Sequence, residues 1–240
     1  PPRPSRRTSG PHVSVVLVIL STANRTRAAA DARAFLDGMR SLLDQTNLSA
    51  DDIRSMLHGT TVATNIVLEA KGARVGLLVT ENFEQVLHLA RSQTPGPLAG
   101  WITMDKPEPL ADLELTLGVP ERINAQGEIL QPLDESRARE MADELVRKGA
   151  DSITISLLHA YANPIHEHKL RDIIASAYPD LPISLSSEIL PEFREYERTL
   201  VTVMNAYVRP GMRRYLDNFR HKLGLFSLQA SDVPHHYNLE

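Results

Sequence analysis

The run His58-Gly59-Thr60-Thr61-Val62-Ala63-Thr64-Asn65 decides how the chain around it is interpreted. It lies where an apolar run, Ile53 to Leu57, meets a helical one, Val62 to Lys71. Together the three segments predict a strand end, a glycine turn and a helix N-terminus rich in hydroxyl groups. Free backbone N–H groups and the helix dipole favour a polar or anionic ligand at such a place.

Two interpretations of this turn follow from the residues alone. Gly59 lets the backbone approach a ligand closely, and the hydroxyls of Thr60 and Thr61 add hydrogen-bond donors. In the plainer interpretation the two threonines only cap the helix, as threonines often do. The spacing favours neither interpretation.

The composition excludes several classes of protein. A length of 240 residues allows one or two domains, and 42% hydrophobic with 23% charged residues is typical of a globular chain. A net charge of −4 gives no nucleic-acid footprint. The absence of cysteine excludes disulfides, thiolate zinc sites and cysteine nucleophiles, and it is compatible with a reducing compartment. No apolar run reaches the length of a membrane span.

Residues 1–25 form an atypical N-terminal segment with two interpretations. Arginines at positions 3, 6 and 7 precede the apolar run Val13 to Leu20, followed by small residues, which is the outline of a secretory signal. The same run is rich in β-branched residues and eight residues long, which predicts a buried strand. We favour the strand, and with it a cytoplasmic location.

The chain then alternates helical and strand-like patterns, which predicts a mostly parallel sheet covered by helices. The proline-rich stretch from Ser92 to Pro120 is predicted to be an irregular insertion. Gly72 is expected to end the helix that starts at Val62, and Pro210 to end or kink the last helix. Helices are expected at 28–43, 62–71, 81–90, 134–148, from Asn163-Pro164 onward and at 191–223; strands at 74–80 and 152–158; and a hairpin at 121–130.

Other clusters of polar residues carry weaker signals. His159, His166 and His168 do not share one helix face, so we interpret them as surface or capping histidines and predict no metal site. The mixed-sign run from Glu192 to Arg198 is interpreted as a solvated helix face rather than an anion grip. The sequence has no Gly-x-Ser-x-Gly elbow, Walker loop or Gly-x-Gly-x-x-Gly motif, so its catalytic residues are unknown.

Ordered blocks of sequence resemble the A subunit of ATP-dependent hydantoinases and the related oxoprolinases. They cover roughly residues 26–222 and are specific together rather than singly. The blocks are His58 to Asn65, Leu68 to Thr80, Lys106 to Leu110, Val119 to Ile123, Leu157 to Pro164 with His166-Glu167, Leu185 to Thr199, and Asn205 to Pro210.

The resemblance implies an actin-like ATPase fold, a ribonuclease H-like α/β sheet covered by helices, here incomplete and with an irregular insertion. It also implies the use of ATP and Mg²⁺ to activate a cyclic amide of the hydantoin or 5-oxoproline type, so that water can open the ring. Relatives use similar activation to carboxylate ketones. A partner subunit of the hydantoinase B type is implied as well.

The chain departs from the family's pattern at both ends. No glycine-rich phosphate loop precedes Asp31, family members are considerably longer, and residues 223–240 diverge, so we expect a truncated chain. Two hypotheses therefore stand. In the first, the chain is part of the enzyme, and His58, Gly59, Thr60, Thr61 and Asn65 line its nucleotide or substrate cleft, with the two threonines as anion donors. In the second, it is a catalytically silent module that keeps the fold.

Overall fold

A computed structural model describes residues 28–46, 59–91 and 108–224, with side chains from 37, 59 and 108 onward and as far as 221. The chain divides into two compact units, residues 1–69 with 212–240 and residues 70–211, and each is described by itself. The strand predicted at 13–20, the apolar run 53–57, His58, Trp101 and the tail from 225 lie outside the described residues.

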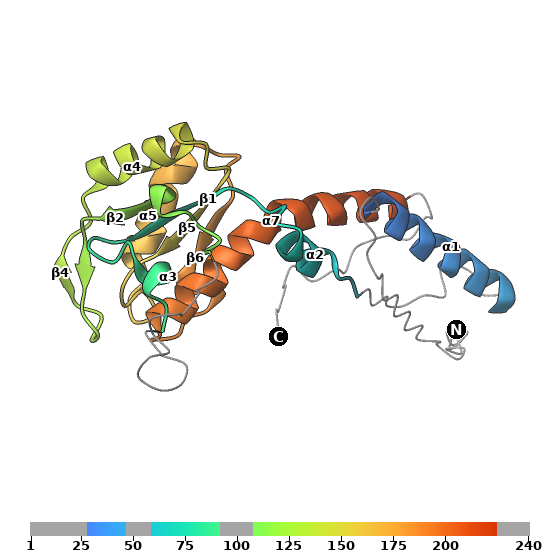
Figure 1. Ribbon diagram of the computed structural model, residues 1–240, viewed down its shortest axis with the longest axis horizontal. Coiled ribbons are helices and arrows are strands. Elements are labelled where there is room, and N and C mark those ends of the chain that lie inside the picture. The colour runs from blue at the N-terminus through green and yellow to red at the C-terminus, as the bar shows by residue number, and fades with distance from the viewer. Residues whose placement is uncertain (1–27, 47–58, 92–107, 225–240) are drawn as a thin grey trace, which may run out of the picture. The chain divides into compact units, whose positions relative to one another are not determined.

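A parallel sheet of four strands forms the centre of the unit 70–211 (Figure 1). Its order is β2-β1-β5-β6, with β1 at Val75–Thr80, β2 at Thr116–Val119, β5 at Ser152–Ser156 and β6 at Ile183–Leu185. Every residue of β1 and β5 is buried, because helices cover both faces of a parallel sheet. The predicted strands at 74–80 and 152–158 and their parallel pairing are confirmed.

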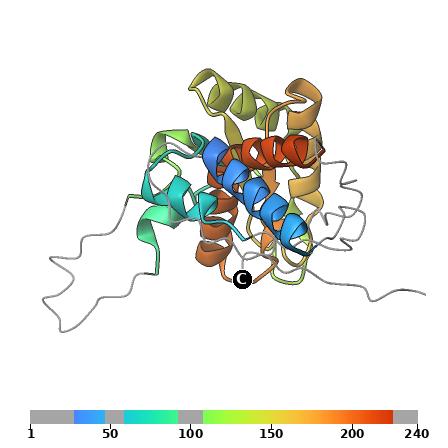
Figure 2. The ribbon, with the colours of Figure 1, turned by 90° about the vertical axis from the view of Figure 1, so that its right-hand side faces the viewer.

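Two helices cover one face of this sheet, α4 at Glu135–Arg147 and α5 at Ile165–Ala177, and they pack against each other (Figures 1 and 2). They enclose the main core with Leu78 of β1 and with Ile153 and Ile155 of β5. Side chains of a strand alternate between faces, so Ser152, Thr154 and Ser156 point to the opposite face. The first part of α7, Glu195–Gly224, covers that face, where Ser152 and Ser156 hydrogen-bond to it.

Local signals explain how several elements begin and end. Asp134 caps α4 by accepting a hydrogen bond from the Arg137 N–H at 3.0 Å, and Gly149 follows the helix at φ 90°. The predicted hairpin is confirmed, with β3 at Arg122–Ile123, β4 at Ile129–Gln131 and Gly127 at φ 82° in the turn. Helix α1, Ala28–Thr46, is also confirmed and extends slightly beyond the predicted end.

Three predicted boundaries are wrong in the first half of the chain. Helix α2 spans only Val62–Leu68, and Ala70 rather than Gly72 adopts a positive φ, of 51°. The helix expected at 81–90 shrinks to α3, Val86–Leu89. The last part of the stretch expected to be irregular, 92–120, has regular structure: a 3₁₀ turn, η3 at Leu113–Leu115, leads into β2. Pairing of β2 with β1 and burial of Val119 outweigh the local proline-rich composition.

The boundaries of the later helices also differ from the prediction. Pro164 takes the position just before α5 rather than the first helical position, and the Asn163 side chain accepts from the Ile165 N–H at 3.2 Å. The helix expected from Pro191 begins at Glu195 as α7, and a short helix that was not predicted, α6 at Ser186–Ile189, precedes it. Among the described helices, none combines the length and apolar character that a membrane span requires.

Pro210 does not end α7, because other parts of the unit replace the hydrogen bond that it removes. A proline at this position has no N–H to donate to the Ala206 carbonyl. The Ser152 hydroxyl donates to that carbonyl at 3.3 Å, and the Ala73 N–H donates to the next one, on Tyr207, at 2.9 Å. Near Pro210 the helix is therefore held by the amino-terminal end of β5 and by the segment just before β1.

Gly72 is needed for close packing rather than for ending a helix. A Cβ atom at this position would lie 2.1 Å from the nearest ring atom of Tyr207, a buried residue of α7. We expect Gly72→Ala to lower the free energy of unfolding by about 1–3 kcal/mol, because the ring must shift. Urea denaturation followed by circular dichroism measures this loss. Gly38→Ala, with nothing within 4 Å, is the matched control; an equal loss in both variants would contradict the packing argument.

Candidate functional site

The glycine–threonine turn lies directly before α2, a helix of seven residues in the unit that includes residues 1–69. Gly59 is exposed, and a Cβ atom there would meet nothing within 4 Å. Thr60, Thr61 and Asn65 are partly buried. The structure therefore places Gly59, Thr60 and Thr61 in the turn and Asn65 in the first turn of α2, while His58 lies outside the described residues.

Contacts inside this turn match the capping interpretation for Thr60 but not for Thr61, which is the N-cap residue of α2 and makes no side-chain cap hydrogen bond. The Thr60 hydroxyl accepts a hydrogen bond from the Val62 N–H at 3.3 Å. The Asn65 side-chain amide donates to the Thr61 hydroxyl, also at 3.3 Å, and its backbone N–H donates to the Thr61 carbonyl at 2.9 Å. Within the described residues, no group of three or more His, Cys, Asp or Glu side chains could hold a metal ion. The described residues of this turn carry no carboxylate, so we assign them no chemistry through Mg²⁺.

A buried polar cluster that the sequence did not predict lies at the carboxyl ends of β1 and β5. The Glu121 carboxylate accepts hydrogen bonds from the Thr80 hydroxyl and, at 2.7 Å, from Nδ1 of His166. The Thr80 hydroxyl oxygen accepts from the Leu158 N–H at 2.9 Å. Thr80, Glu121 and His166 are all buried. The cluster connects the ends of β1 and β5, the segment after β2 and the first turn of α5.

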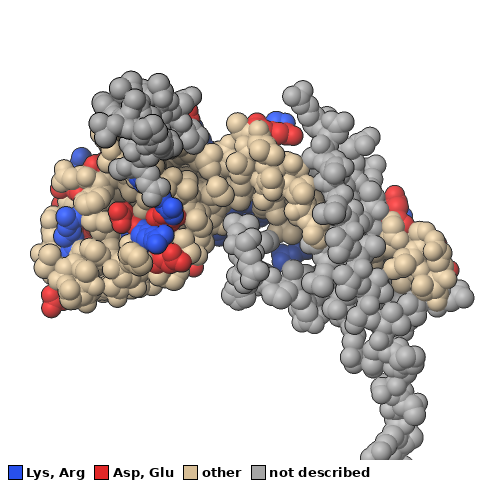
Figure 3. All heavy atoms as spheres, turned by 60° about the horizontal axis from the view of Figure 1, so that its bottom comes forward, with Lys and Arg blue, Asp and Glu red and all other residues tan. Residues whose placement is uncertain are grey.

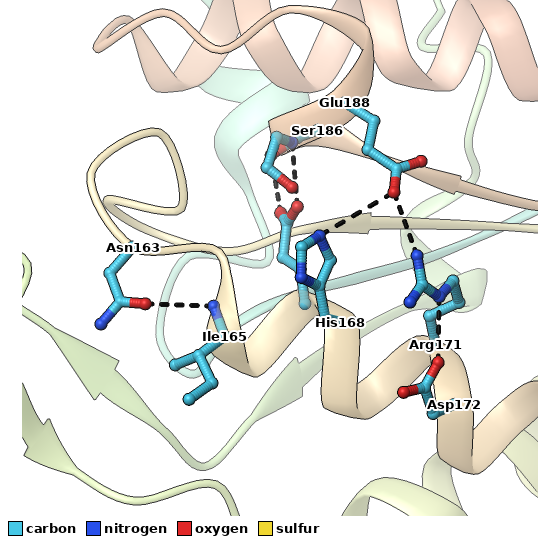
Figure 4. A network of polar contacts seen from close by, with 9 residues as sticks. Asn163, Ile165, His168, Arg171, Asp172, Ser186 and Glu188 are labelled. Carbon is cyan, nitrogen blue, oxygen red and sulfur yellow. Dashed lines mark hydrogen bonds and ion pairs between the residues drawn. The ribbon is translucent and has the colours of Figure 1, made fainter.

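A second buried cluster centres on Ser186, which lies above the first turns of α5 (Figure 4). Its hydroxyl donates to Oε1 of Glu167 at 2.6 Å and accepts from Nε of Arg198 at 3.1 Å. Glu167 also accepts from the N–H groups of Leu157 and Ser187. The other two nitrogens of Arg198 donate to the carbonyls of Glu192 and Leu157. Glu167 is 0% exposed and Arg198 1% exposed, so water does not solvate them. These hydrogen bonds compensate both groups inside the protein.

Burial and charge act in opposite directions on these two groups. Burial raises the pKa of Glu167 above its ordinary value of 4.5, while hydrogen bonds from Ser186, Ser187 and Leu157 lower it. Burial lowers the pKa of Arg198, and the negative charge of Glu167 raises it. The shared hydroxyl of Ser186 keeps the two charges close without direct contact, which limits the penalty for desolvating them.

Two interpretations from the sequence are corrected here. His166 is not a surface or capping histidine, since it is buried against Glu121, whereas His168 lies near Glu188 at the surface, at 3.8 Å. The run from Glu192 to Arg198 is not a uniformly solvated face, because Arg198 is buried. The signal for Arg198 was its position one turn before Thr202, on the helix face that α7 buries against the sheet.

Charged side chains elsewhere on the described surface are mixed in sign. Lys and Arg lie beside Asp and Glu on the face shown in Figure 3. Near α5, Arg171 bonds both Asp172 and Glu188 (Figure 4). Such exposed pairs contribute little to stability individually.

The buried pair makes a prediction about stability. Arg198→Met should lower the free energy of unfolding by about 3–5 kcal/mol, because it leaves Glu167 buried without compensation. Arg194→Met removes an exposed arginine from the turn before and should change it by no more than about 0.5 kcal/mol. Adding Glu167→Gln to Arg198→Met should recover part of the loss. Urea denaturation measures these three variants and Glu167→Gln alone, and strictly additive losses in the double variant would refute the coupling.

Glu167 also predicts a dependence of stability on pH. Because its pKa is raised in the folded protein, it binds its proton more tightly there than in the unfolded chain. Its contribution to the free energy of unfolding is therefore greatest below pH 4.5 and falls as the pH rises through the raised pKa. The free energy of unfolding of the natural chain, relative to that of Glu167→Gln, should therefore decrease as the pH rises. A pH-independent difference in urea titrations would rule out this role.

Comparison with known proteins shows which family this chain resembles. The family described as hydantoinase/oxoprolinase N-terminal region matches residues 10–178. The acetophenone carboxylase gamma subunit of Aromatoleum aromaticum is 33% identical, over 75% of this chain and 26% of that protein. The caprolactamase subunit alpha of Pseudomonas jessenii is 32% identical, again over 75% of this chain and 26% of the relative.

A solved structure supports the same assignment. The crystal structure of the ATP-dependent caprolactamase from Pseudomonas jessenii matches with a TM-score of 0.72 and 27% identity, over 87% of this chain and 30% of that one. The predicted α/β fold of the actin-like ATPase type is confirmed. The chain spans about a quarter of the length of the curated relatives it matches. It belongs to the hydantoinase/oxoprolinase family, whose N-terminal region it contains.

Proposed function

We propose that this chain is the N-terminal region of an ATP-dependent enzyme that opens a cyclic amide ring of the hydantoin or 5-oxoproline type. The match to the hydantoinase/oxoprolinase N-terminal region over residues 10–178 carries this proposal. The matched caprolactamase supports it, since its name describes a lactam hydrolase and its structure is described as ATP-dependent.

The proposed chemistry explains why such an enzyme needs ATP. An unstrained amide is a poor electrophile, and its nitrogen is a poor leaving group. Transfer of the γ-phosphoryl group of ATP to the amide oxygen releases ADP and makes the carbonyl carbon open to attack by water. The ring C–N bond then breaks, and a second water molecule releases phosphate from the acyl phosphate that remains. The protein's task is then to position hydrogen-bond donors around the carbonyl and the phosphates.

We infer that the turn of His58, Gly59, Thr60, Thr61 and Asn65 lines the nucleotide or substrate cleft. The open space around Gly59 supports this role, because backbone and ligand can approach closely there. The contacts of Thr60 and Thr61 within the turn, at 3.3 Å, are long and can be exchanged for bonds to a ligand.

A partner subunit and a cytoplasmic location belong to the same proposal. The two curated relatives above are both named as subunits of larger enzymes. We propose that this protein likewise works with a second subunit of the hydantoinase B type. A chain without cysteine suits the reducing environment of the cytoplasm.

Carboxylation of a ketone is the second candidate reaction. The acetophenone carboxylase subunit is as similar to this chain as the caprolactamase subunit is, at 33% against 32% identity. Both reactions begin at the carbonyl of a small substrate. We prefer ring opening because it is the reaction of the enzymes that the matched family is described by.

Thermal unfolding with Mg-ATP tests the nucleotide part of the proposal. A ligand at about a hundred times its dissociation constant adds about 2.7 kcal/mol, which raises the midpoint of a chain of this size by about 5–11 °C. Replacing both Thr60 and Thr61 with Ala should abolish the shift. Thr46→Ala, at the exposed end of α1, is the matched control and should keep it.

An activity assay completes this test. ADP release that depends on hydantoin or 5-oxoproline, with the ring-opened product, is the expected result. Dependence on a ketone and bicarbonate instead would select the carboxylase reaction. If a folded sample shows no thermal shift and no substrate-dependent ADP release, the chain is a catalytically silent module.

A further inference from the structure

The sheet has a point where its strand order reverses, between β1 and β5. β1 pairs with β2 on one side and with β5 on the other, and all four strands are parallel. In open α/β sheets, ligands bind outside the carboxyl ends of the strands at such a point. Here the two strand ends are joined by the hydrogen bond from the Leu158 N–H to the Thr80 hydroxyl, at 2.9 Å.

The chain leaves both of these strands through an unusual backbone conformation. His159, three residues after the end of β5, has a φ of 55°, and Asn82, two residues after the end of β1, has a φ of 71°. Residues other than glycine rarely adopt positive φ, and such residues cluster at functional sites. The His159 carbonyl accepts from the N–H groups of Ala162 and Asn163, at 2.9 and 3.2 Å, which fixes the turn.

Two side chains on this turn have unused hydrogen-bonding capacity. His159 and Tyr161 are both partly exposed, and the Tyr161 hydroxyl lies 3.5 Å from Nδ1 of His159. That distance is at the long limit for a hydrogen bond, so both groups can turn to a ligand. They are not free to drift, however. The guanidinium carbon of Arg198 lies 5.6 Å from the centre of the Tyr161 ring and holds it by a cation–π contact.

We propose that His159 and Tyr161 bind the carbonyl oxygen of an uncharged cyclic amide at the carboxyl ends of β1 and β5. This inference rests on the proposed function and names the substrate group that the fold would receive there. An imidazole N–H and a phenol O–H are neutral donors that suit a carbonyl oxygen. The exposed amide of Asn82, beyond the neighbouring strand, suits the N–H of the same ring.

The charges around this site favour a neutral ring over one that carries a carboxylate. Each of the three nitrogens of Arg198 already donates to a protein oxygen, so this cation stabilises Tyr161 rather than an anion. Glu81, exposed directly after β1, adds negative charge at the same edge. Hydantoin and ε-caprolactam should therefore bind more tightly than 5-oxoproline, whose carboxylate Glu81 repels.

Titration of the 240-residue chain by NMR, with each of these three amides as the probe, tests the proposal. Tyr161→Phe keeps the ring over Arg198 and removes only the hydroxyl. His159→Gly removes the imidazole and suits the positive φ, so the turn stays folded. Each variant should weaken the binding of hydantoin and ε-caprolactam about fivefold or more, the loss of one hydrogen bond.

Matched controls come from the same unit. Tyr178→Phe removes a phenol that donates a hydrogen bond to Asp143, and His168→Ala removes a partly exposed histidine near Glu188. Both should bind the amides as the natural chain does. Unchanged affinity in Tyr161→Phe and His159→Gly, no binding of any amide by the natural chain, or tighter binding of 5-oxoproline would each overturn the proposal.

The readouts separate this inference from the proposed function. Ring-dependent ADP release with unchanged amide affinity in the two variants would leave the enzyme proposal standing and remove this site from it. Weakened amide binding in the variants, in a protein that never couples ATP to ring opening, would keep the binding site and refute the reaction.

Discussion

The guanidinium group of Arg198 is the constraint on which the carboxyl edge of the sheet depends. It donates to the ends of three separate segments: Leu157 after β5, Ser186 after β6 and Glu192 before α7. A buried arginine tolerates no loss of these acceptors, since an uncompensated buried charge is far costlier than an unmade surface bond. The positions of α7 and of the turn after β5 are therefore set by one side chain, with Glu167 supplying the balancing charge.

The second cluster repeats this arrangement on neighbouring strands. Glu121 receives hydrogen bonds from Thr80 and His166, and thereby joins β1, the segment after β2 and the start of α5. Sequence blocks far apart in the chain are thus partners in space: the block 157–167 supplies Glu167 and His166, and the block 185–199 supplies Ser186 and Arg198. Most of the polar residues in these blocks hold the backbone in place. His159 and Tyr161 are the exceptions, and we propose that they bind a ligand.

Periodic and local signals were enough to predict the strands β1 and β5, the hairpin and helix α4 to within a few residues. These signals failed where contacts between distant parts of the chain determine the structure. Nothing local marks 116–119 as a strand, because its order comes from pairing with β1. Glu121 and His166 are 45 residues apart, so no spacing rule could join them. Arg198 stood among exposed charges of both signs and was assigned to solvent with them.

The backbone hydrogen bond that α7 lacks at Pro210 couples two distant positions, 210 and 152. The Ala206 carbonyl needs a donor, and Ser152 supplies it only because Pro210 does not. In a chain with an N–H at position 210, the Ala206 carbonyl would no longer need the Ser152 hydroxyl. Ser152→Ala would then change stability little. In a chain that kept the proline, a residue at 152 without a small donor would leave the Ala206 carbonyl without this hydrogen bond. The effect of either substitution thus depends on the genetic background in which it arises.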